Sequence, residues 1–190
     1  MNFRRPLLLC YVAIGLALLV ILMGAWTRIM DAGLGCPDWP GCFGQLIVPA
    51  SQEQIALAQH RFGGVEIDLF KGWVEMTHRY MAASLGALIL LLAFFGWRCR
   101  KEPGYPVYLS FMLLALVMLQ GLFGMWTVTL KLLPPVVTIH LMGGLLTLTL
   151  LVLLASKLRQ FGLSPRRRSA GWGLRLAVII LFIQILLGGW

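Results

Sequence analysis

Charged residues are scarce in this chain: they make up 12% of its 190 residues, whereas 59% are hydrophobic. A mean hydropathy of +0.86 excludes a water-soluble globular domain, in which about a quarter of the residues are charged. The net charge of +9 does not indicate a nucleic-acid partner, because the basic residues gather in short segments between apolar runs. We therefore expect an integral membrane protein that binds no nucleic acid.

Cysteine is also rare, with four residues in the chain. Only Cys36 and Cys42 lie close together, on either side of a tight Pro-Asp-Trp-Pro-Gly segment. In an oxidising compartment such a pair is expected to form a disulfide. A zinc site is less favoured, since no second His or Cys stands at ligand spacing within an apolar run.

Five apolar stretches are long enough to cross a bilayer, which takes about 20 helical residues. They cover residues 7–29, 73–97, 107–130, 136–155 and 174–190. The first lacks an Ala-x-Ala cleavage signature, so we interpret it as a retained helix rather than a signal peptide. The last has about 17 residues and no flanking charge, which indicates that a second half of the protein begins near Leu174.

A weak repeat relates the first and third stretches. Gly24-Ala-Trp-Thr27 ends the first stretch, Gly124-Met-Trp-Thr127 ends the third, and Leu187-Gly-Gly-Trp190 resembles the start of the same signature. In any single copy the pattern is equally typical of a small packing residue beside an interfacial Trp.

The predicted fold is therefore an all-α integral membrane protein. We expect residues 1–158 to form a four-helix unit from two related hairpins. Residues 159–173 would then be a cytoplasmic basic linker, and 174–190 the first span of a second half.

The Lys and Arg residues predict the orientation. Eleven of the sixteen fall on one side of the predicted membrane: Arg4, Arg5, Arg98, Arg100, Lys101, Lys157, Arg159, Arg166, Arg167, Arg168 and Arg175. The positive-inside rule places that side, and the N-terminus, in the cytoplasm. Residues 30–71 are then an external loop, where an oxidising environment suits the cysteine pair. Within that loop, Ser51 and Gln54 form a capping-box pattern that predicts a short amphipathic helix over 51–62, lying on the membrane surface as a lid.

Three ionisable residues stand out within the apolar runs: Glu75, His78 and His140. Such residues are costly in a membrane and point to a functional site. Both histidines lie about 8 Å below the expected external starts of their helices, so they should be level. Two level imidazoles on facing helices can clamp a haem iron.

Neighbouring residues suit a haem. Small residues follow each histidine, namely Ala82, Ala83, Ser84 and Gly86, and then Gly143 and Gly144. Three cations at the same face could meet the propionates: Arg28, Arg79 and Lys131.

Each of these residues also has a structural interpretation. His78 could be a packing histidine bonded to the backbone, and Glu75 could simply pair with Arg79 four residues on. As a functional group, Glu75 would relay protons or stabilise developing positive charge. His60 lies in the polar loop and is expected to be a solvated surface residue.

Four segments together resemble the haem A synthases. The segments are Thr27–Gly44 with its Cys-Pro-Asp-Trp-Pro element, Glu75-Met-Thr-His-Arg79, Gln120–Lys131 and Val137–Gly144, and they cover nearly the whole chain in order. The family oxidises a ring methyl group of haem O to a formyl group, giving haem A for cytochrome oxidase. The resemblance implies eight spans in two similar halves, each with its own histidine pair.

By that resemblance, His78 and His140 are the haem-iron ligands of the first half and Glu75 is the catalytic carboxylate. Cys36 and Cys42 match the family's loop cysteines. The first half would hold the substrate haem O and the missing half a haem b, so the chain as given would bind haem without turnover. Expected partners are membrane lipid, haem O synthase, the cytochrome oxidase assembly machinery and an electron donor. The expected location is the bacterial inner membrane, with the haem site near its external face.

Two other functions remain open. The chain could be a b-type cytochrome in which His78 and His140 hold a permanent haem that Glu75 tunes. It could also be a non-catalytic haem-binding factor for oxidase assembly. Glu75 discriminates between them, because only an enzyme needs its carboxylate for chemistry.

Overall fold

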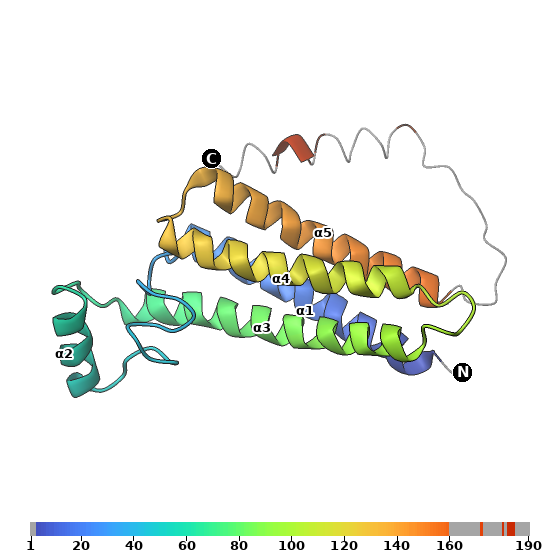
Figure 1. Cartoon of the computed structure of the whole chain (residues 1–190). Coiled ribbons are helices and arrows are strands. Elements are labelled where there is room, and N and C mark those ends of the chain that lie inside the picture. The colour runs from blue at the N-terminus through green and yellow to red at the C-terminus, as the bar shows by residue number, and fades with distance from the viewer. Residues whose placement is uncertain (1–2, 160–171, 173–179, 181, 185–190) are drawn as a thin grey trace.

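The computed structural model describes residues 3–159, 172, 180 and 182–184. The described part is built from helices (Figure 1), with one isolated bridge between Cys42 and Gln45. The helices are α1 (Arg4–Ile29), α2 (Gln52–Arg61), α3 (Leu69–Arg98), α4 (Val107–Thr129) and α5 (Pro134–Arg159). The predicted fifth span, the basic linker and the third copy of the repeat lie largely or wholly outside the described residues.

Within the described residues, four helices are long and apolar enough to cross a membrane: α1, α3, α4 and α5. They pack as an antiparallel bundle in which α1 contacts α3 and α5, and α4 contacts the same two helices (Figure 1). Apolar side chains also cover the outside of the bundle, as expected where lipid is the solvent. The predicted all-α membrane fold is confirmed, and the chain is a multi-pass membrane protein.

Three of the long helices, α1, α3 and α5, extend beyond the apolar stretches that predicted them, and α4 matches its stretch to within one residue. α3 begins at Leu69, four residues before the expected Trp73, because the Asp68 side chain caps it by accepting a hydrogen bond from Lys71 N at 3.0 Å. α5 begins at Pro134, a residue suited to the first helical position since it has no N–H to satisfy. Hydropathy marks the membrane-buried part of a helix, whereas capping sets its ends.

The repeat is visible in the hydrogen bonds that end α1 and α4. Met30 N donates to Trp26 O, and Ala32 N donates to Thr27 O at 2.8 Å. One hundred residues later, Leu130 N donates to Trp126 O, and Leu132 N donates to Thr127 O at 2.8 Å. Asp31 and Lys131 both adopt a positive φ at this turn, 48° and 50°. The two Gly-x-Trp-Thr copies therefore end their helices in the same way.

The packed apolar core occupies one end of the bundle. It includes Cys10, Ala13 and Ala17 of α1, Leu85, Ile89 and Leu92 of α3, Leu113 of α4, and Leu151, Leu154 and Leu158 of α5. This end contains the N-terminus and the turn between α3 and α4 (Figure 1). Toward the opposite end the buried polar side chains of the helices are Thr27, Glu75 and Thr138, whereas Thr147 lies near the middle of α5 and Ser110 lies at the core end. The candidate site lies at this second end.

The loop between α1 and α3 forms a small folded unit beyond that end. Cys36 and Cys42 are joined by a disulfide, as predicted. Asp38 closes the same turn by accepting hydrogen bonds from Phe43 N at 2.6 Å and Gly44 N at 2.8 Å.

The predicted loop helix is present as α2, with the complete capping box between Ser51 and Gln54. α2 packs through Ala58 on a cluster that holds the disulfide and Phe43, and it lies past the start of α3 (Figure 1).

Candidate functional site

His78 lies on α3 and its ring faces α1. A methyl group added at Gly24 would stand 3.1 Å from the His78 Cε1 atom, so glycine leaves the room that the imidazole occupies. The ring also meets the backbone of Val20, one turn away on the same face of α1. The first copy of the repeat therefore provides the surface on which His78 packs.

His140 has the equivalent position in the second hairpin. Its ring lies against Gly124 of α4, where an added methyl would stand 3.5 Å from Cε1. Gly24 and Gly124 hold the same place in the two repeats, so the two histidines stand at one level of the bundle. They come from α3 and α5, which are diagonal to each other, and His78 is close enough to act electrostatically on His140.

Both imidazoles keep an unused polar atom. The Nδ1 atoms of His78 and His140 are buried and have no hydrogen-bond partner among the described residues. A buried nitrogen without a partner is costly, and such atoms are candidates for binding a missing group. A methyl added at Gly144, one turn beyond His140, would meet nothing within 4 Å, so the space at this glycine is open.

The described residues contain no group of three or more His, Cys, Asp or Glu side chains that could hold a bare metal ion. Two facing imidazoles are instead a ligand set that haem iron takes. The residues present therefore fit a haem by their donor atoms and by the small residues beside them.

Glu75 and Arg79 connect the site to the disulfide loop. The Glu75 side chain is 5% exposed and pairs with the Arg79 guanidinium through its Oε1 atom. Its Oε2 atom accepts a hydrogen bond from Cys36 N at 2.9 Å. Arg79 also donates to Asp38 O at 3.0 Å and to the Gly41 carbonyl at 2.6 Å. One ion pair on α3 thus holds both sides of the disulfide turn.

The other predicted cations are on the surface. Arg28 is exposed in the last turn of α1, and Lys131 is exposed in the turn after α4. His60, expected to be a solvated loop residue, is exposed at the end of α2. Whether Arg28, Arg79 or Lys131 meets a propionate stays a prediction.

Sequence reasoning missed the two glycines and the loop contacts. The repeat marks Gly24 and Gly124 in the sequence, but it does not show that the histidines pack against them. The repeat could have indicated this role, because a glycine that recurs at the same topological position is expected to do the same thing in both copies. Nothing in the sequence indicated that Glu75 would accept a hydrogen bond from Cys36, 39 residues away.

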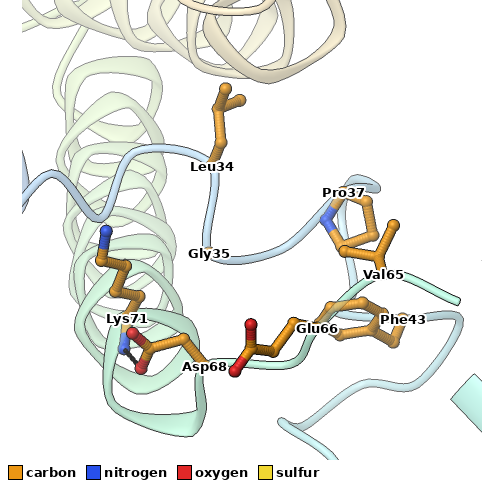
Figure 2. Close-up of a pocket in the computed structure, with 8 residues that line it drawn as sticks. All are labelled: Leu34, Gly35, Pro37, Phe43, Val65, Glu66, Asp68 and Lys71. Carbon is orange, nitrogen blue, oxygen red and sulfur yellow. Dashed lines mark hydrogen bonds between the residues drawn. The ribbon is translucent and has the colours of Figure 1, made fainter. Parts of the chain in front are cut away.

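A separate pocket lies outside the bundle, between the disulfide loop and the start of α3 (Figure 2). Its volume is about 410 Å³, and it is lined by Leu34, Gly35, Pro37, Phe43, Val65, Glu66, Asp68 and Lys71. Lys71 is paired with Asp31 at 3.3 Å. Neither histidine lines this pocket, so it is distinct from the candidate site.

Comparison with known proteins identifies the family. The model of the COX15-CtaA family, described as cytochrome oxidase assembly protein, matches residues 8–190. This chain belongs to that family. Several COX15-CtaA relatives are named haem A synthase. The one from Shewanella oneidensis is 46% identical over 176 residues, covering 91% of this chain and 52% of the relative. The one from Mesorhizobium japonicum is 32% identical over 199 residues, covering 94% and 54%.

No solved structure matches the chain. The chain spans about half the length of the COX15-CtaA relatives it matches. The resemblance to haem A synthases that the sequence motifs indicated is confirmed at the level of the family.

Proposed function

We propose that this chain carries the substrate half of a haem A synthase, an oxidoreductase that converts the methyl group of haem O to the formyl group of haem A. The observation that carries the proposal is the pair of imidazoles, His78 and His140, each with a buried Nδ1 atom that has no hydrogen-bond partner among the described residues, and each packed on one of two equivalent glycines. The relatives named haem A synthase support the same activity.

In this proposal His78 and His140 hold the haem iron, and Glu75 is the catalytic carboxylate. Haem iron, when bound, would supply the redox chemistry. The chain itself holds the ring in place through the imidazoles, and Arg79 and Cys36 N orient the Glu75 carboxylate. In that position Glu75 would take up or release protons as the methyl group is oxidised.

The proposed surroundings follow from the topology. The positive-inside rule places the site near the external face of the bacterial inner membrane. A haem O synthase would supply the substrate, and the machinery that assembles cytochrome oxidase would take the product. Dioxygen would be the oxidant, the formyl oxygen would come from dioxygen or water, and a separate donor would supply the electrons needed to reduce dioxygen to water. A haem b would belong to a second half of the protein.

The haem ligands are tested by replacing each histidine. We expect His78→Ala and His140→Ala to lower low-spin haem binding, because each removes one axial ligand, and the visible spectrum of the protein purified from membranes measures this. Leu119→Ala, at a half-exposed position on α4, is the matched control and should leave the spectrum unchanged. An unchanged spectrum in both histidine variants would refute the proposal that His78 and His140 hold the haem iron.

One observation favours the non-catalytic alternatives, a b-type cytochrome or an assembly factor. Both Glu75 oxygens are engaged, one with Arg79 and one with Cys36 N, so the carboxylate also has a structural role. In a carrier, that role would be its only one.

Glu75→Gln separates the alternatives, because the amide oxygen can still accept from Cys36 N while the charge is lost. In a full-length enzyme that contains this half, we expect haem to be retained and conversion of haem O to haem A to fall by about 100-fold or more. Pigment extraction and chromatography of the membranes measure both quantities. Haem A formation at the unmodified rate in Glu75→Gln would show that the chemistry does not need the carboxylate. Absence of haem A formation by the unmodified full-length protein, with haem retained, would argue for a carrier.

A further inference from the structure

Gln120 is an uncharged carboxamide in an otherwise apolar helix. It is the one Asn or Gln in the described parts of the four long helices. An amide in a membrane interior costs free energy unless its donors and acceptors are used. The Gln120 side chain is half-buried and forms no hydrogen bond with any described residue. The amide therefore requires an explanation.

The side chain faces the interior of the bundle. Leu113, Val117, Gln120, Gly124 and Val128 recur every three or four residues and share one face of α4. Leu113 at one end of this stripe is fully buried, and Gly124 contacts the His140 ring. The Gln120 carboxamide lies against the α5 backbone at Gly143, where an added methyl group would overlap it.

Gln120 lies farther than the two histidines from the loop end of the bundle. Gln120 precedes Gly124 by four residues, or about 6 Å along the helix, toward the packed core. Gly143 likewise follows His140 by about one turn in the same direction. The amide thus lies deeper in the membrane than the imidazoles, by a distance comparable with half the width of a porphyrin ring.

The two repeats differ at this position. Val20 precedes Gly24 as Gln120 precedes Gly124, so the first hairpin has an apolar side chain where the second has an amide. A symmetrical packing role would be filled equally well by Val in both. The polar side chain at this level of the bundle therefore stands on the α4–α5 side alone.

We propose that Gln120 recognises the hydroxyl group that distinguishes haem O from haem B. This inference rests on the proposed function. Haem O carries a hydroxyl-bearing farnesyl chain where haem B has a vinyl group, on the ring edge remote from the propionates. If the charged propionates lay at the polar external end, that edge would point toward the packed core. There the Gln120 amide can donate a hydrogen bond to the hydroxyl oxygen or accept one from its proton.

A site that uses a substrate hydroxyl discriminates against the analogue that lacks it, because the protein group is then left unpaired. The test is competitive uptake of haem O and haem B by the protein purified from membranes, with the haem taken up quantified by chromatography. We expect the unmodified protein to prefer haem O. We expect Gln120→Leu to lower that preference on the order of tenfold while haem B uptake is maintained.

Two further variants make the test specific. Gly143→Ala retains the amide but displaces it, so it should lower the preference in the same direction. Met118→Ala, on the exposed side of the same helix, should leave the preference unchanged.

Three outcomes are distinguishable. Haem O preference retained in both Gln120→Leu and Gly143→Ala would overturn the role of Gln120. Equal loss of both haems in Gln120→Leu would also overturn it, since that pattern indicates a structural role. An unmodified protein that takes up haem B but shows no preference for haem O would instead overturn the proposed substrate.

Discussion

At the scale of single residues, the imidazoles depend on what lies opposite them. His78 and His140 are carried by α3 and α5, but the room for their rings is made by glycines on α1 and α4. The two contacts are not equal, because the added methyl would stand 3.1 Å from the ring at Gly24 and 3.5 Å at Gly124. The first distance requires the ring to move, whereas the second is ordinary van der Waals contact.

This difference gives a matched pair of variants. We expect Gly24→Ala to shift the His78 ring and weaken low-spin haem binding, and Gly124→Ala to have a clearly smaller effect. The visible spectrum during haem titration measures both. A larger loss in Gly124→Ala than in Gly24→Ala would contradict the packing of the two rings.

At the scale of elements, the external loop is held at several points. The disulfide closes the turn, Asp38 accepts two backbone N–H groups inside it, and Glu75 with Arg79 fixes it to α3. α2 is attached differently, through Ala58 and through its own capping box. A helix of 10 residues is marginal by itself, so the cap contributes a large share of its local stability.

Ser51→Ala removes the side-chain acceptor for Gln54 N. We expect a local loss of about 1 kcal/mol, seen as faster hydrogen exchange of the α2 amides with the long helices unaffected. Gln52→Ala, at the exposed first position of the helix, is the control. Faster exchange throughout α3 as well would show that α2 and the bundle unfold as one unit.

At the scale of the whole molecule, the antiparallel bundle puts the loop and both histidines at one end and the packed core at the other (Figure 1). Which end faces the cytoplasm is predicted by the distribution of Lys and Arg. A single introduced cysteine at each end tests this prediction.

We expect Leu46→Cys, in the loop, to react with a membrane-impermeant maleimide in intact cells, and Lys101→Cys to react only after the cells are permeabilised. Leu46 is 81% exposed and Lys101 is exposed. The native Cys10 and Cys99 should contribute little background because both are buried, and burial raises the pKa of the Cys99 thiol, so little reactive thiolate forms. The reverse labelling pattern would show that the loop faces the cytoplasm, opposite to the predicted orientation.

Much of this arrangement follows from the sequence alone. Long apolar runs can satisfy their backbone groups in a membrane only as helices, so four spans were predictable near their observed bounds. The α2 cap and the Cys36–Cys42 disulfide join residues that are three and six positions apart, and local patterns predicted both. Glu75, His78 and His140 stood out because ionisable groups are rare in apolar runs.

Only the tertiary structure decided what these residues meet. A helical repeat fixes which face a side chain occupies, but not which residue of another helix stands opposite. The contact of Gly24 with His78, the hydrogen bond from Cys36 N to Glu75 and the position of Gln120 against Gly143 each join separate elements. These contacts depend on the relative height and rotation of packed helices, which are set by side-chain packing throughout the bundle.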